Sequence, residues 1–159
     1  MDSSRNTLLQ PTLSQDKSIA TPFSVQTTFF TAFFGAPLAA LAITIINAYR
    51  LRRSVRDLPT LLVLLLLAVA VGWLTDGPGA VPKAFAAWLD LHLGDNGDNI
   101  VHRFFSLCIV GAGYLLHRRE QRNAEVLALE RPNGWLVGIP CALLGAIAWT
   151  AVVLSIRGL

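Results

Sequence analysis

The sequence predicts an all-α integral membrane protein, a four-helix bundle with one short helix lying at the outer membrane interface. Hydrophobic residues make up 53% of the 159 residues and charged residues only 14%, whereas about 25% of an average soluble domain is charged. The mean hydropathy is +0.53, and the apolar residues fall in long blocks separated by arginine-rich loops. This composition argues against a soluble enzyme domain, a disordered tail and a nucleic-acid-binding module.

Four apolar segments have the length of membrane crossings. A helix needs about 20 residues, within a range of about 17–25, to span the hydrocarbon core of a bilayer. Proline is tolerated inside such a helix because neighbouring helices satisfy the freed backbone groups, and Pro37 predicts a kink in the first crossing. The predicted crossings cover residues 27–49, 58–75, 100–116 and 134–156.

The third crossing is the shortest and begins with two ionisable residues, His102 and Arg103. It spans the bilayer if Arg103 extends along its apolar stem to the headgroups. The alternative is three crossings and a buried half-helix.

Three further segments lie outside the crossings. Residues 1–26 lack the basic region and apolar core of a signal peptide and are predicted to form a polar, mobile tail. Residues 81–93 are amphipathic and too few to span, which predicts a helix in the outer interface, ended by Gly94. Residues 117–130 are rich in helix formers, so we expect the third helix to extend out of the membrane and stop before Pro132.

The basic residues indicate the orientation. The loop between the second and third crossings is acidic, whereas the loops after the first and third crossings hold eight of the thirteen basic residues. Because cytoplasmic loops carry an excess of Lys and Arg, both arginine loops are predicted to be cytoplasmic, and four crossings then place both termini outside. The eight residues are Arg50, Arg52, Arg53, Arg56, Arg118, Arg119, Arg122 and Arg131.

The acidic loop offers candidate metal ligands. Carboxylates suit calcium, and two histidines with a carboxylate suit zinc. The alternative is a plain helix-to-helix turn, which uses Asp, Asn and Gly for its geometry alone, and no cofactor is predicted. The candidate ligands are Asp90, His92, Asp95, Asp98 and His102.

Other polar residues of the crossings are candidates for binding or packing. His102 and Arg103 could contact an anion or a lipid headgroup, since an ionisable residue in a crossing is a functional candidate; the alternative is anchoring at the headgroups with pairing to Asp98. Asn47 is expected to form a hydrogen bond between helices, a packing role rather than a ligand contact.

Small residues recur at four-residue spacing in the first and fourth crossings. Close backbone contact drives helix association in lipid, and small residues permit it. We expect these faces to pack within the bundle, or to form a seam with a protein partner or a second copy. They contain Ala32, Gly35, Ala36, Ala39 and Ala40 in the first crossing, and Gly138, Cys141, Ala142, Gly145 and Ala146 in the fourth.

The segment Phe33-Phe34-Gly35-Ala36-Pro37-Leu38-Ala39, followed by Asn47 and Arg50, resembles the opening crossing of a diffuse group of uncharacterised bacterial multi-pass membrane proteins. In that group the segment often reads FFG-G-PLA, and Ala36 stands here in place of the second glycine. The resemblance implies a bacterial inner-membrane protein and brings no activity with it.

The sequence favours a non-catalytic function. No predicted crossing contains Asp or Glu, which proton-coupled transporters usually need, and no phosphate-binding glycine loop or CxxC pair is present. We therefore expect a subunit, scaffold or immunity-type protein that binds a partner in the membrane. The alternatives are a small transporter or channel, possible only if Thr31, Thr44, Asn47, Ser106 and Thr150 line a pore, and a lipid-acting enzyme built on residues 90–102.

Overall fold

The computed structural model describes residues 21–127 and 130–158, and all regular structure in these ranges is helical. The predicted all-α bundle is therefore confirmed. The helices are α1 (Val25–Arg50), α2 (Ser54–Asp76), α3 (Ala80–Leu93), α4 (Gly97–Leu116), α5 (Arg118–Val126) and α6 (Trp135–Arg157).

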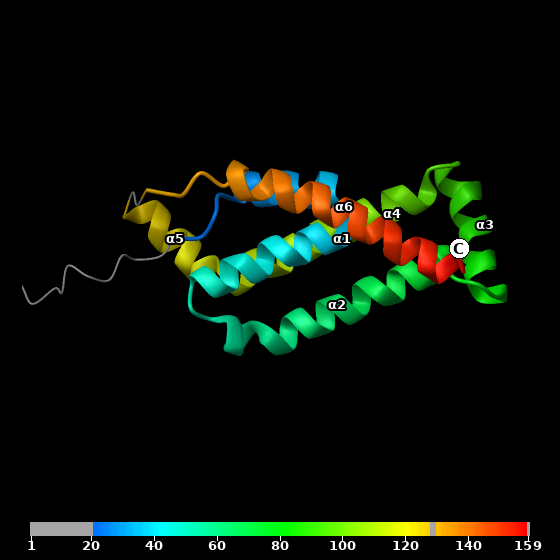
Figure 1. Ribbon diagram of the computed structural model, residues 1–159, viewed down its shortest axis with the longest axis horizontal. Coiled ribbons are helices and arrows are strands. Elements are labelled where there is room, and N and C mark those ends of the chain that lie inside the picture. The colour runs from blue at the N-terminus through cyan, green and yellow to red at the C-terminus, as the bar shows by residue number, and fades with distance from the viewer. Residues whose placement is uncertain (1–20, 128–129, 159) are drawn as a thin grey trace, which may run out of the picture.

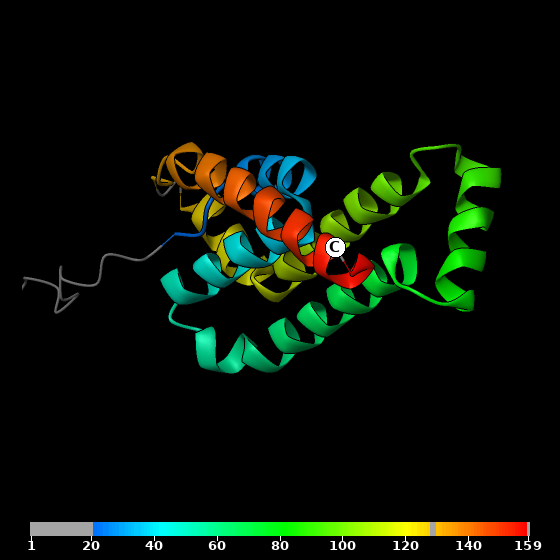
Figure 2. The same ribbon diagram turned by 45° about the vertical axis from the view of Figure 1, so that its right-hand side comes forward.

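By the length and composition of their sequences, four of these elements, α1, α2, α4 and α6, are candidate membrane spans. The chain is thus a multi-pass membrane protein. The long helices lie along the longest axis of the molecule, while α3 crosses one end of the bundle and α5 lies at the other (Figures 1 and 2).

Helix α1 reverses its direction at Ala36, which has φ 63° and ψ −178° and interrupts the helix before Pro37. The backbone N–H of Phe23 donates to Asn47 Oδ1 at 2.9 Å, although these residues would be about 36 Å apart along a straight helix. Arg50 Nε likewise donates to the carbonyl of Thr21. The helix is therefore a hairpin of two half-helices, residues 25–35 and 37–50, which enters and leaves at the same end of the bundle (Figure 1).

The hairpin corrects three expectations. The stretch 27–49 is not one kinked crossing, because each half-helix is shorter than the about 20 residues that a crossing needs. The described chain begins and ends at opposite ends of the bundle, which four straight crossings do not produce: Thr21 lies at the arginine-rich end beside Arg50, and Arg157 lies at the opposite end beside Asp76. Residues 21–26, taken as part of a mobile tail, include the fully buried Phe23; residues 1–20 lie outside the described residues.

The small-residue faces of α1 and α6 pack against each other. This is the first of the two expectations, packing within the bundle. Gly35 lies on the backbone of Ala142, and Gly145 lies on the backbone of Ala39. Both contacts form around the hairpin turn, so α6 supports the hairpin where its helix is interrupted. These close backbone contacts of the small residues are therefore made within one chain.

The turn at Ala36 leads to a stability prediction. A positive φ strains a residue with a Cβ, by about 1–2 kcal/mol, and glycine carries no such strain. Ala36→Gly is expected to raise the unfolding free energy by about 1 kcal/mol, measured by denaturant unfolding in detergent micelles. Ala40→Gly, in the regular part of the second half-helix, is the control. It is expected to cost about 2 kcal/mol, because glycine is the poorer helix former and the buried methyl group of Ala40 is lost. A loss of stability in both variants would contradict the strained turn.

Helix α4 ends at Leu116, and α5 begins as a separate helix at Arg118. The expectation of one continuous helix through residues 117–130 is therefore wrong. His117 at the junction has φ −107°, and its side chain turns inward to Asp57. Residues 128–129 of the predicted extension lie outside the described residues.

Helix α3 lies across the end of the bundle and contacts α2 and α4. Pro82 and Leu89 are its buried residues, while Trp88 and Val81 are exposed. The predicted helix end is confirmed, because Gly94 follows α3 with φ 75°. The amphipathic pattern thus forms the helix expected from the sequence.

Candidate functional site

Two buried Asp–His pairs join α2 to α4, one at each end of the two antiparallel helices. At the arginine-rich end, His117 Nε2 lies 2.8 Å from Asp57 Oδ2, and both side chains are at most 3% exposed. Arg53 also approaches Asp57, at 3.9 Å. Burial in the bundle makes each polar group dependent on its partner.

The second pair lies at the opposite end. His102 Nε2 is 3.4 Å from Asp76 Oδ2 and 2.9 Å from Thr75 Oγ1. Trp149 Nε1 donates to His102 Nδ1 at 3.4 Å. Since Nδ1 accepts, the proton of a neutral imidazole belongs on Nε2, where it faces the Asp76 carboxylate and the Thr75 hydroxyl.

This arrangement links side chains of α2, α4 and α6. With its proton on Nε2, His102 donates toward Thr75 and is not placed to remove the hydroxyl proton as a general base. Asp76 is also bonded to Arg157 of α6. The cluster therefore ties three helices together at this end.

Sequence reasoning missed both aspartates. Asp57 and Asp76 flank the charge-free stretch 58–75 and fall outside the predicted crossing, but the helix extends over both and buries them. One feature of the sequence could have indicated these pairs: His102 and His117 lie near the two ends of the next crossing, as Asp57 and Asp76 do for the stretch 58–75. Antiparallel packing of neighbouring helices brings each histidine to one aspartate.

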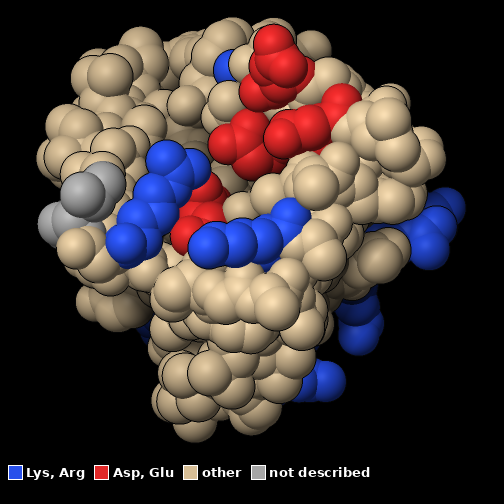
Figure 3. Space-filling view, turned by 90° about the vertical axis from the view of Figure 1, so that its right-hand side faces the viewer, with Lys and Arg blue, Asp and Glu red and all other residues tan. Residues whose placement is uncertain are grey.

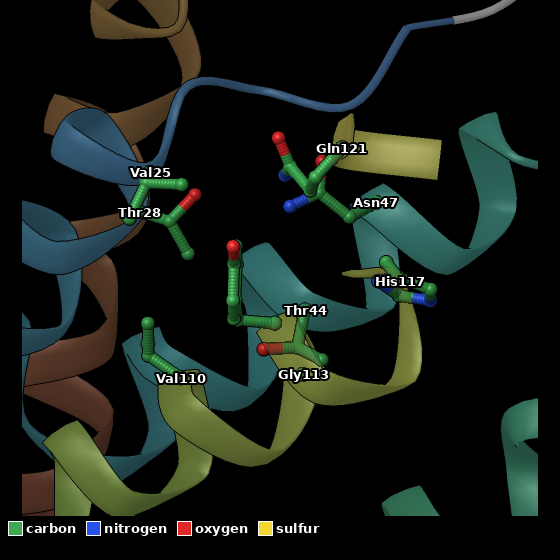
Figure 4. A pocket seen from close by; sticks show the side chains of 9 residues that line it. Val25, Thr28, Thr44, Asn47, Val110, Gly113, His117 and Gln121 are labelled. Carbon is green, nitrogen blue, oxygen red and sulfur yellow. The ribbon is translucent and has the colours of Figure 1, made fainter. Parts of the chain in front are cut away.

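A small polar cavity lies between the two halves of α1, α4 and α5 (Figure 4). Its volume is about 20 Å³, which is enough for about one water molecule. Gln121 donates to the carbonyl of Phe23, whereas its Oε1 atom is buried and has no partner among the described residues. The polar lining residues are Thr28, Thr44, Asn47, Tyr114, His117 and Gln121.

A larger cavity, of about 450 Å³, lies where the first turn of α2 meets the end of α4 and α5. We call it the arginine cavity. Its only acidic lining residue is Glu120, which accepts a hydrogen bond from Arg53 at 2.5 Å. It is lined by Arg53, Arg56, Leu115, Leu116, Arg118, Arg119, Glu120 and Arg122.

Two apolar grooves lie beside α1. The α1–α2 groove lies between its second half-helix and α2, and the α1–α6 groove lies between its first half-helix and α6. The α1–α2 groove has a volume of about 320 Å³ and the α1–α6 groove about 330 Å³. Side chains such as Leu38, Ile45 and Leu62 line the first, and Phe34, Trp135 and Leu143 line the second.

The structure does not gather the candidate metal ligands of the acidic loop. His92 Nδ1 bonds to the carbonyl of its own helix residue Trp88, and Asp98 accepts from the backbone N–H of Asn99. Among the described residues no three His, Cys, Asp or Glu side chains form a metal-binding group. Figure 3 shows acidic and basic side chains around a hollow at this end of the bundle.

The residues proposed for headgroup contact also separate. His102 points into the bundle and pairs with Asp76 rather than with Asp98. The exposed Arg103 lies over the ring of Phe33, with its guanidinium carbon 5.0 Å from the ring centroid. Asn47, expected to bond another helix, instead accepts from the segment that precedes α1.

Of the candidate pore residues, Thr44 and Asn47 line the small polar cavity, and four of the five form hydrogen bonds within their own helices. The hydroxyl groups of Thr31, Thr44, Ser106 and Thr150 each donate to the carbonyl four residues earlier in their own helix. Such local bonds satisfy a hydroxyl group without water.

No family model, curated protein or solved structure matches this chain.

Proposed function

We propose that this protein is a non-catalytic membrane protein, a subunit, scaffold or immunity-type protein that binds a partner protein within the bilayer. The observation that supports this proposal is the apolar core of the bundle. Its core consists of packed apolar side chains, with Ala32, Ala40, Leu41 and Ile109 among them, and its hydroxyl groups are satisfied locally. The Asp–His pairs lie at the two ends of this core, and the apolar middle between them offers shape for binding.

A small transporter or channel is the second candidate, and the hairpin of α1 favours it. Non-helical backbone at membrane depth occurs where protein buries it or where it lines a water-filled cavity, as in transporters and selectivity filters. Here protein buries the turn at Ala36, against Ala142 and Gly145 of α6. The polar cavity between the half-helices has room for only about one water molecule, so the described residues favour partner binding over transport.

The α1–α2 groove is the surface that we assign to the partner. Its lining is almost entirely aliphatic, and α6 and α4 cover the other sides of the hairpin. Helices associate in lipid through close van der Waals packing, and an apolar groove fits a transmembrane helix of the partner.

The orientation follows from the arginine-rich end. By the positive-inside rule this end faces the cytoplasm, in a bacterial inner membrane if the resemblance of the first helix holds. Residues 21–24 then lie on the cytoplasmic side and the C-terminal end of α6 lies outside. Three crossings and one re-entrant hairpin replace the four crossings expected from the sequence.

Photo-crosslinking within the membrane tests the partner. Leu62 lines the groove and is 50% exposed, while Leu67 on the opposite face of α2 is 47% exposed. A photoreactive amino acid at position 62 is expected to give a discrete adduct with one other membrane protein, and the same residue at position 67 none. Equal adducts from both positions, adducts with lipid alone, or an adduct between two copies of this chain would each contradict the proposal.

A further inference from the structure

We propose that the arginine cavity binds a phosphate group, either in the headgroup of an anionic phospholipid or free in solution. Two segments far apart in the sequence supply its walls: Arg53 and Arg56 at the start of α2, and residues 115–122 of α4 and α5. Arginine loops that only orient a membrane protein do not have to share a cavity. Here five arginine side chains surround a space of about 450 Å³.

The charge of the arginine cavity is not balanced. Glu120 is bonded to Arg53, and the other lining arginines form no ion pair within residues 21–127 and 130–158. Arg56, Arg118, Arg119 and Arg122 therefore add four positive charges around one space. Like charges at this density repel one another, and a bound anion removes the repulsion.

The geometry of guanidinium groups points to phosphate. Arginine donates two parallel hydrogen bonds to a phosphate and is less strongly hydrated than lysine. The cavity lies where α2 begins and α4 ends, and the ends of crossing helices lie at the depth of the headgroups. Leu115 and Leu116 give one wall an apolar surface, as the glycerol end of a lipid requires, and basic pockets between helices are known to bind lipid headgroups.

Two double variants distinguish binding in the arginine cavity from attraction by all the basic residues at this end of the bundle. Arg56→Gln with Arg119→Gln removes two charges that line the cavity. The control, Arg52→Gln with Arg131→Gln, removes two charges from the same end; neither residue lines the cavity, and Arg131 pairs with Glu125. Circular dichroism and the melting temperature in phosphatidylcholine nanodiscs verify that both variants fold.

Binding is measured with two probes. Nanodiscs that contain phosphatidylglycerol in phosphatidylcholine report lipid retention by native mass spectrometry, and inorganic phosphate added to protein in phosphatidylcholine alone reports free phosphate by its effect on the melting temperature. Each lost hydrogen bond between an arginine and the phosphate costs about a factor of ten in affinity, so the cavity variant is expected to lose about a hundredfold. The control is expected to lose much less.

Selective retention of phosphatidylglycerol that the cavity variant loses supports the lipid source, and a phosphate-dependent shift that the cavity variant loses supports the free anion. Equal losses in the cavity variant and the control would overturn the proposal, because they indicate attraction by the surface as a whole. Absence of both effects in the unmodified protein would also overturn it.

Discussion

Replacing Gly145 by alanine is expected to destabilise the bundle by about 2–3 kcal/mol, the upper range for overpacking a tight interior. A Cβ atom at this position would lie 2.7 Å from both the N and Cα atoms of Ala39. These are backbone atoms of the hairpin just beyond its turn, so no side-chain rotation relieves the clash. The hairpin has to move away from α6, and the measurement is the unfolding free energy in detergent micelles.

Gly111→Ala is the matched control for this prediction. Gly111 lies in α4, and a Cβ atom there would meet nothing within 4 Å. Alanine is the better helix former by about 1 kcal/mol, so this variant is expected to be neutral or slightly more stable. If both glycine variants lose the same stability, contact between α6 and the hairpin is not what stabilises the fold.

Replacing Asp57 by alanine is expected to cost about 3 kcal/mol or more, as removal of one partner of a buried pair usually does. The change leaves His117 buried without its 2.8 Å partner and removes a neighbour of Arg53. Asp57→Asn is expected to cost less, because its amide oxygen still accepts a hydrogen bond. Unfolding free energies of these variants in micelles provide the measurement.

A double-mutant cycle with His117→Ala isolates the pair itself. We expect a coupling energy of about 1–3 kcal/mol between Asp57 and His117, since the two side chains are in direct contact. Asp95→Ala serves as the control, because Asp95 is exposed and surface substitutions usually change stability by less than about 0.5 kcal/mol. A coupling energy near zero would show that each side chain is stabilised by other groups.

The long apolar helices could be predicted from the sequence because the hydropathy of a segment indicates whether it lies in lipid or in water. The predicted crossings 58–75 and 100–116 lie within α2 and α4, and the crossing 134–156 differs from α6 by one residue at each end. Hydropathy carries no information on direction, however, so the stretch 27–49 was equally compatible with a crossing and with a hairpin. The break around Gly35 and Pro37 is visible in the sequence, but alanine at position 36 gives no sign of the positive φ that reverses the chain.

The two Asp–His pairs could not be predicted, because they depend on which helices pack side by side, and one sequence does not show this. His102 was singled out, but its neighbour in the chain, Asp98, was the partner considered; in the fold its partners come from α2 and α6. Asp57 and Asp76 were assigned to loops because they border an apolar stretch. Their burial depends on which helices lie side by side, and this follows only from the assembled bundle.

The fold-back of α1 has a consequence for biogenesis. The half-helices are synthesised before α6, yet the small residues that support their turn belong to α6. Neither half-helix is long enough to be stable across a bilayer alone, and the carbonyl groups at the break lack helical partners until protein surrounds them. The turn of the hairpin can therefore reach its packed position only after α6 has been synthesised.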